Sequence, residues 1–75
     1  MLKSMLLLEV FDRDGNLIKR RISDNVYSIE DWLNANAFKW ASVPVEVECD
    51  MYGDGTIHAN GAIWYTFHTT SIGTV

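Results

Sequence analysis

Apolar and polar side chains alternate strictly over residues 43–51. Successive side chains of a strand point to opposite faces of a sheet, so this pattern predicts a half-buried β-strand with one apolar and one acidic face. Pro44 cannot donate a ladder hydrogen bond, which places it near the start of the strand or on a sheet edge. On the acidic face, carboxylates about 7 Å apart form a row made of Glu46, Glu48 and Asp50.

Residues 4–22 predict a β-hairpin that turns within the segment FDRDGN. A two-residue turn would set Glu9 opposite Arg20, whereas a three-residue loop with Gly15 left-handed would set Glu9 opposite Lys19. We favour the second register because it leaves Glu9 and Lys19 as an exposed pair and gathers more aliphatic side chains on one face. These side chains are Leu6, Leu8, Val10, Ile18 and Ile22.

A helix is predicted to follow, beginning near Ile29. Ser28 is a favourable N-cap, and Glu30 and Asp31, which follow it, place negative charge where the helix dipole favours it. Tyr27 and Trp32 occupy the positions of a hydrophobic staple. The helix either ends near Asn36, as the Asn-rich segment favours, or continues with Phe38 as an exposed aromatic residue.

Strands and turns are predicted for the rest of the chain, and residues 71–75 are expected to fray. The segments YGDG and ANGA form either two tight turns around a short strand, 56–59, or one long loop. The final strand sets Ile63, Tyr65 and Phe67 on one face and Trp64, Thr66 and His68 on the other.

The predicted order is therefore β-β-α-β-β, with a fifth short strand if both turns form. We expect residues 1–75 to form a single small α+β domain, with one helix packed on an antiparallel four- or five-stranded sheet. A domain of this size buries only about 60% of its unfolded surface, so self-association is a further source of stability.

The net charge of −4 is concentrated in the C-terminal half. All six basic residues lie at or before Lys39, and the remainder of the chain carries only acidic charges: Glu46, Glu48, Asp50 and Asp54. Such a surface repels phosphate, so we expect no direct nucleic-acid binding there and favour basic partners.

Targeting and cysteine patterns predict a soluble cytoplasmic protein. The apolar run 5–8 is shorter than the roughly 7–15 residues of a signal-peptide core and the ~20 of a membrane span. The single Cys49 excludes an intrachain disulfide and is expected to be a buried, unreactive thiol in a reducing compartment.

Candidate chemistry is sparse, and we expect no enzyme activity, metal ion or other cofactor. The chain has no CxxC, HExxH, GxSxG, GxGxxG or P-loop pattern. A zinc site would need both histidines to converge with Cys49 and Asp50, which point to opposite faces of their strand. The order D-x-D-G-N from Asp12 lacks the glycine and glutamate positions of an EF-hand.

The acidic row and surplus aromatic residues predict a docking face for a protein with a basic surface. The candidate partner-binding residues are Glu46, Glu48, Asp50, Asp54, Trp64, Phe38 and Trp40, with Tyr52 as a further anchor. Small acidic domains of this kind are common among bacterial and bacteriophage accessory proteins that bind and inhibit or redirect a host protein, and we expect such a role. Mimicry of nucleic-acid phosphates is a narrower version of it. The alternatives are a homo-oligomeric structural subunit, such as a homodimer, and a cation binder at residues 50–54.

Overall fold

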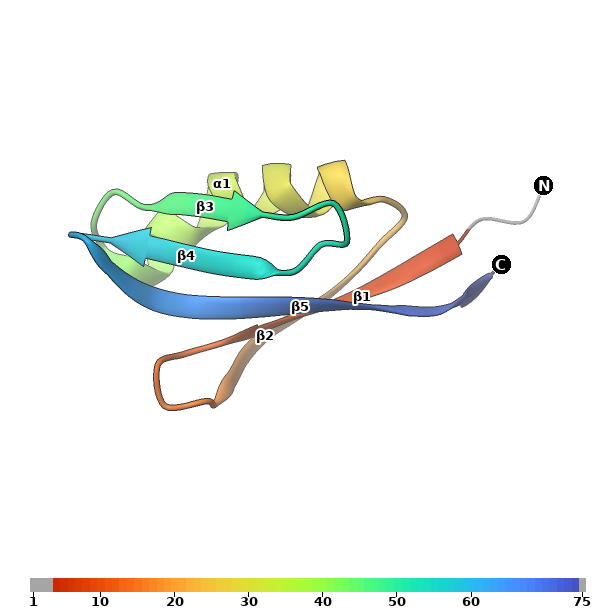
Figure 1. The fold of residues 1–75 in the computed structure, drawn as a ribbon, viewed down its shortest axis with the longest axis horizontal. Helices are drawn as coiled ribbons and strands as arrows, with labels where there is room; N and C mark the ends of the chain where they lie inside the picture. The colour runs from red at the N-terminus through yellow and green to blue at the C-terminus, as the bar shows by residue number, and fades with distance from the viewer. Residues whose placement is uncertain (1–3, 75) are drawn as a thin grey trace.

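The computed structural model describes residues 4–74 and places the side chains of residues 5–73. Its elements are β1 (Ser4–Phe11), β2 (Leu17–Ser23), α1 (Val26–Ala41), β3 (Glu46–Cys49), β4 (Gly55–Ala59) and β5 (Ala62–Thr74). The strands form one antiparallel sheet in the order β2-β1-β5-β4-β3, and α1 packs on one side of it (Figure 1). The predicted α+β fold is confirmed, and β4 is the fifth short strand.

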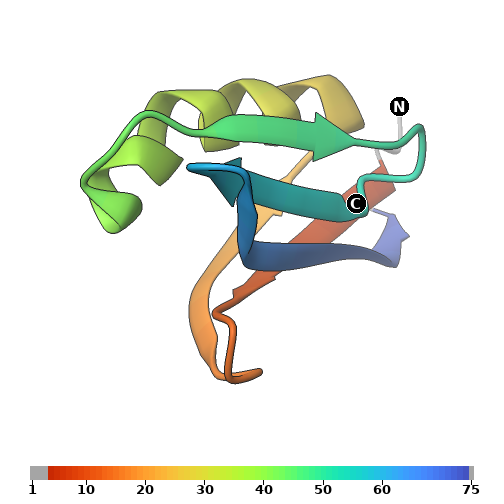
Figure 2. The ribbon, with the colours of Figure 1, turned by 60° about the vertical axis from the view of Figure 1, so that its left-hand side comes forward.

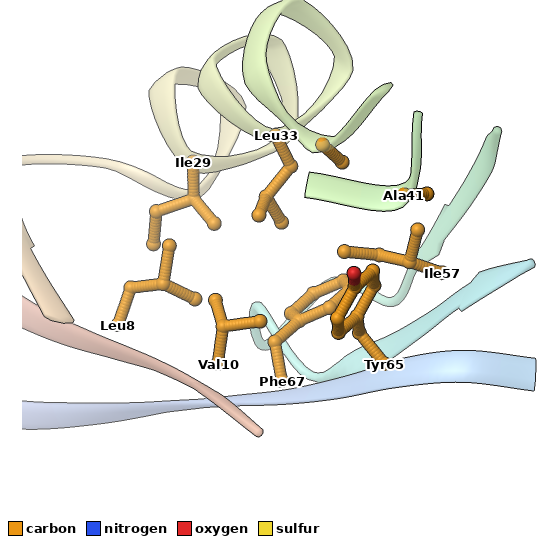
Figure 3. Packing of buried hydrophobic residues seen from close by; sticks show 9 residues of the cluster. Leu8, Val10, Ile29, Leu33, Ala41, Ile57, Tyr65 and Phe67 are labelled. Carbon is orange, nitrogen blue, oxygen red and sulfur yellow. The ribbon is translucent and has the colours of Figure 1, made fainter. Parts of the chain in front are cut away.

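The core lies between α1 and one face of the sheet (Figure 3). The helix buries every fourth residue from Ile29 to Ala41, which forms a single stripe on its surface. Each fully buried aliphatic side chain contributes about 1.5–3 kcal/mol relative to an exposed one. The buried cluster is Leu8, Val10, Ile29, Leu33, Ala37, Ala41, Ile57, Tyr65 and Phe67.

No helix or strand of residues 4–74 covers the other face of the sheet, which we call the open face. The pairing registers place on it the side chains that alternate with the buried ones. Its members are Leu7, Glu9, Phe11, Leu17, Arg20, Ile22, Glu46, Glu48, Thr56, His58, Ile63, Thr66, His68 and Thr70.

Two of the hairpins turn through the same five-residue loop, DRDGN at 12–16 and DMYGD at 50–54. In both, the N–H of the first residue donates to the carbonyl of the fifth at 2.9 Å. The glycine N–H donates to the carbonyl of the first residue, at 3.1 Å for Gly15 and 3.2 Å for Gly53. The glycines have φ of +84° and +88°, the left-handed region that glycine adopts without steric cost. The three-residue loop predicted for the first hairpin is confirmed.

The register beyond this loop differs from the one we favoured. Ile18 is an extra residue in β2, a bulge that shifts all later pairs by one. Glu9 therefore lies opposite Arg20 instead of Lys19, and the two side chains form an ion pair of 3.0 Å on the open face. The same shift turns Ile22 away from the core, where it is 56% exposed.

The predicted start of the helix is wrong. α1 begins at Val26, and its N-cap is Asn25, whose Oδ1 accepts the N–H of Ser28 at 2.7 Å. Asn and Ser cap equally well, and capping at Asn25 adds nearly a full helical turn. Tyr27 then lies in the first turn and is exposed, so it forms no staple with Trp32.

The helix continues beyond Asn36, which is the second of the two predicted alternatives. Asn34 and Asn36 stay helical and donate their side-chain amides to carbonyls one turn earlier, at 3.1 and 2.7 Å. The helix ends at Ala41, where the left-handed Ser42 donates its N–H to the carbonyl of Phe38 at 2.8 Å. Phe38 is exposed on the last turn.

The alternating burial expected for residues 43–50 is confirmed, but only Glu46–Cys49 forms a strand. Pro44 precedes β3, an edge strand of the sheet, as proline requires. Met51 is not on the apolar face of that strand, because it lies in the loop 50–54.

The last strand also contains a bulge. Tyr65 pairs with Ile57, but His58 pairs with Ile63, so Trp64 is an extra residue. Tyr65 and Phe67 share one face as predicted, and this face is the core, whereas Ile63 lies on the open face. Residues 71–74, which we expected to fray, continue β5 and pair with β1. Residue 75 lies outside the described residues.

The two glycine loops provide a matched test of the packing around β5. A Cβ on Gly15 would meet nothing within 4 Å, whereas one on Gly53 would lie 2.7 Å from Oγ1 of Thr69. Gly15→Ala should lower the free energy of unfolding by roughly 1–2 kcal/mol, because alanine is strained in the left-handed conformation. Gly53→Ala should lower it by a further ~1–3 kcal/mol, because the added methyl group overpacks against Thr69. Urea unfolding of both variants measures the difference, and equal losses would contradict the close approach of this loop to β5.

Candidate functional site

The predicted acidic row keeps two of its three carboxylates, those of Glu46 and Glu48. Glu46 and Glu48 are exposed on the open face of β3. Glu48 Oε2 lies 3.6 Å from Nε2 of His58, and the same nitrogen lies 2.6 Å from Oγ1 of Thr56. Because the carboxylate and the hydroxyl share one ring nitrogen, Glu48 does not orient the imidazole from Nδ1 as the acid of a catalytic triad does.

Asp50 turns its carboxylate away from that row and into the loop 50–54. Its Oδ1 accepts the N–H of Tyr52 at 2.8 Å and the N–H of Asp54 at 3.0 Å. These two bonds, that from Asp54 first, hold the pKa of Asp50 below its ordinary value because they stabilise the charged carboxylate. Asp50 thus fixes the conformation of the loop.

Asp54 joins this loop to the central strand. Its Oδ1 accepts the N–H of Thr69 at 2.9 Å and lies 2.8 Å from Nδ1 of His68. The Thr69 hydroxyl donates to the carbonyl of Gly53. The carboxylate is therefore a link between the loop and β5 through its Oδ1.

The three predicted aromatic anchors lie in different places. Trp40 is half-buried and packs against Trp32 and Tyr65, with ring centroids 5.6 and 5.9 Å apart. Trp64 is half-buried against the core cluster, beneath the guanidinium of Arg13, which is 4.8 Å from the ring centroid. Phe38 is exposed beside a shallow groove of about 530 Å³ after the helix. The predicted anchors and carboxylates thus do not gather on one surface.

A different group of side chains does gather, where α1 begins and the loop 50–54 turns. Figure 1 shows these two segments beside each other. Tyr27, Met51 and Tyr52 are 81%, 78% and 71% exposed, more than any other large hydrophobic side chain of the described residues. Tyr27 and Met51 line a hollow of about 440 Å³. We call the surface around this hollow the end patch, which comprises Tyr27, Glu30, Cys49, Asp50, Met51 and Tyr52.

The end patch carries a negative potential. The thiol of Cys49, half-buried in the hollow, has a pKa raised first by burial and then by the carboxylates of Glu30, Asp50 and Asp54. Each carboxylate disfavours the negatively charged thiolate, so the negative charges of all three reach the position of the Cys49 sulfur. A cationic group entering the hollow would experience the opposite, favourable effect.

Sequence reasoning missed the end patch because it assigned its most exposed members to buried positions. Tyr27 was expected to pack in a hydrophobic staple, and Met51 on the apolar face of a strand. One signal was available: the motif D-x-x-G-[ND] occurs at 12–16 and again at 50–54. Recognising the second copy would have placed Met51 and Tyr52 at an exposed loop tip.

The described residues contain neither a grouped set of metal ligands nor a membrane-spanning helix. Among residues 4–74, no three His, Cys, Asp or Glu side chains are grouped so that they could hold a metal ion. In the same part of the chain, no helix is long and apolar enough to cross a membrane.

Comparison with known proteins provides no family assignment. No protein-family model matches the chain, and no curated protein or solved structure matches it at a significant level. Any function must therefore be argued from the surfaces described above.

The loop carboxylate predicts an acid-dependent stability. A carboxyl whose folded-state pKa is depressed stabilises the fold above its unfolded-state pKa, near 3.8, and loses this contribution as the pH falls through the folded-state value. Asp50→Ala should therefore lower the melting temperature at pH 7, and its difference from the wild type should shrink below about pH 4.

Asp50→Asn and Asp14→Ala are the controls for this experiment. Asn keeps a neutral acceptor for the two loop N–H groups, so Asp50→Asn should lie between the wild type and Asp50→Ala at pH 7. Asp14 is exposed in the equivalent loop, so Asp14→Ala should have little effect. A destabilisation by Asp50→Ala that is constant from pH 2 to 7 would show that the charge of Asp50 contributes nothing.

Proposed function

We propose that this protein is a non-enzymatic interaction module that binds a partner protein with a basic surface at the end patch. The observation that supports this most is that Tyr27 and Met51, the two most exposed large hydrophobic side chains described, line one hollow together with carboxylates. Tyr52, the third most exposed, follows Met51 in the same loop. Exposed hydrophobic side chains scattered singly need no explanation, whereas a cluster around a hollow is typical of an interaction site.

The residue types of the end patch suit such an interface. Tyr and Met are enriched in protein interfaces, and tyrosine supplies a large contact area with few rotatable bonds to immobilise. Glu30 and Asp50 lie at the edge of these apolar side chains. Charges in that position accelerate association with an oppositely charged partner and exclude acidic ones.

The patch is also held in place before any partner arrives. Tyr27 lies on the first helical turn, which is capped by Asn25, and Met51 and Tyr52 lie in a loop fixed by Asp50 and Asp54. A surface that is already ordered loses less conformational entropy on binding. The free energy of the contacts is then available for affinity.

The consequence for the partner depends on what its basic surface normally binds. Occupying a site for nucleic acid or another acidic ligand would inhibit the partner, which agrees with an accessory protein that blocks or redirects a host factor. Phosphate mimicry by the strand row has less support, because Asp50 points into its loop and only Glu46 and Glu48 remain in the row. The end patch replaces that row as the proposed contact.

Capture from a bacterial lysate with the tagged protein, followed by titration of the purified partner, tests the proposal. Combining Tyr27→Ser with Met51→Ser should weaken binding at least about tenfold, because interface anchors contribute well over 1 kcal/mol each. Added salt should slow association, since the carboxylates attract the partner over distance.

Phe38→Ser combined with Ile72→Ser is the matched control, because both side chains are about half exposed and lie outside the end patch. This variant should bind like the wild type. Equal weakening by the two double variants, or an association rate that does not change with salt, would reject the end patch as a docking site for a basic partner.

A further inference from the structure

We infer that the hollow of the end patch receives one arginine side chain of the partner protein, with its guanidinium between the ring of Tyr27 and the carboxylate of Glu30. This arginine site rests on the proposed function, because it names the group of the basic partner that the end patch binds. The lining residues come from two segments, the charged ones are acidic, and arginines already pack on aromatic rings elsewhere in this chain.

Two segments of the chain enclose the hollow. Tyr27 and Glu30 lie three positions apart on α1, so their side chains are neighbours on one side of the helix. Cys49 and Met51 come from the end of β3 and the loop after it. Figure 2 shows the start of α1 beside this end of β3. A side chain that enters between the segments therefore meets the ring and the carboxylate on one side and the two sulfur-containing side chains on the other.

The charged side chains that line the hollow, Glu30 and Asp50, are both acidic. Neither pairs with a lysine or arginine of residues 4–74. Asp50 accepts two N–H groups of its own loop, whereas Asn34 bonds only to the backbone carbonyl of Glu30 and leaves its carboxylate accessible to a ligand. Burial first, and then these two charges, raise the pKa of the Cys49 thiol, so both act inside the hollow. A cation there is attracted by both charges and can accept its hydrogen-bonding partner in Glu30.

Arginine fits these walls better than lysine. Its guanidinium is planar and weakly hydrated, stacks on an aromatic face and donates two parallel hydrogen bonds to a carboxylate. The ammonium group of lysine is a compact, strongly hydrated charge without a flat surface. The aliphatic stem of arginine would pack against Met51, whose unbranched thioether adapts to irregular shapes. One arginine side chain therefore uses the ring, the carboxylate and the apolar wall together.

Arginines pack on aromatic rings at two other places in this protein. The guanidinium of Arg13 lies 4.8 Å from the ring centroid of Trp64, and that of Arg21 lies 5.1 Å from the ring centroid of Trp32. Both distances are typical of cation–π contacts. No lysine or arginine lines the hollow, and none of residues 4–74 lies over the ring of Tyr27. The cation for this ring is therefore supplied by the partner.

Titration with a short peptide tests the arginine site while the partner is unidentified. The peptide carries one arginine between glycine and serine residues, and its binding to ¹⁵N-labelled protein is followed by NMR. The backbone N–H resonances of residues 26–30 and 49–51 should shift together, with a dissociation constant of about 1 mM, as expected for one small anchor. The same peptide with citrulline, the neutral analogue of arginine, should bind at least about fivefold more weakly, because hydrogen bonds between charged groups are stronger.

Glu30→Gln removes the accessible carboxylate and should weaken binding of the arginine peptide at least about fivefold. Glu46→Gln is the matched control, because Glu46 is exposed on β3 and does not line the hollow. This variant should bind the peptide like the wild type. Unchanged resonances of the buried residues establish that both variants are folded.

Three outcomes would overturn the arginine site. The first is that no resonance around the hollow shifts at peptide concentrations up to about ten times the expected dissociation constant. The second is equal binding of the citrulline peptide, and the third is equal weakening by Glu30→Gln and Glu46→Gln, which would indicate attraction to the overall negative charge. If any of these is found while the variant with Tyr27→Ser and Met51→Ser still loses the captured partner, the arginine site fails and the proposed function stands.

Discussion

The structure depends on the packing of one helix against one face of the sheet. α1 is about 10–12 Å wide with its side chains, and the five strands lie about 4.8 Å apart. The helix therefore covers only part of the face on which it packs, and it leaves the open face to solvent. Two surfaces follow from this constraint. The end patch surrounds the start of α1, and the open face is the side that no element of residues 4–74 reaches.

Periodicity predicts the element order because strands and helices repeat their buried positions differently. It does not predict bulges, since an extra residue is accommodated by the partner strand and leaves no clear mark in the local sequence. Inserting one residue has a large effect, because the side-chain period of a strand is two and every later side chain moves to the opposite face of the sheet. Ile18, Trp64 and Ile72 are extra residues, and the first two move Ile22 and Ile63 to the open face. Part of the apolar surface of that face therefore arises from features that the pattern conceals.

The candidate site was harder to predict than the fold, for a related reason. Its position depends on a competition between Asn25 and Ser28 for the helix cap, which two residue types of equal capping strength leave undecided. It also depends on the hydrogen bonds of Asp50, which turn an expected surface carboxylate into a loop constraint. Local patterns predict which side chains are charged or aromatic. Only tertiary structure brings Tyr27 beside Met51.

The central position of β5 also has a kinetic consequence. β5 is the last strand of the described chain, and its pairing with β1 joins residues as far apart in the sequence as Leu6 and Ser71. The β1–β2, β3–β4 and β4–β5 hairpins can each close locally, but they become one sheet only when β5 pairs with β1. Closing so long a loop is entropically costly, so this step should limit the rate of folding. Until it occurs, β1 and β5 both expose an unpaired edge, and molecules caught at that stage are prone to pair with one another instead.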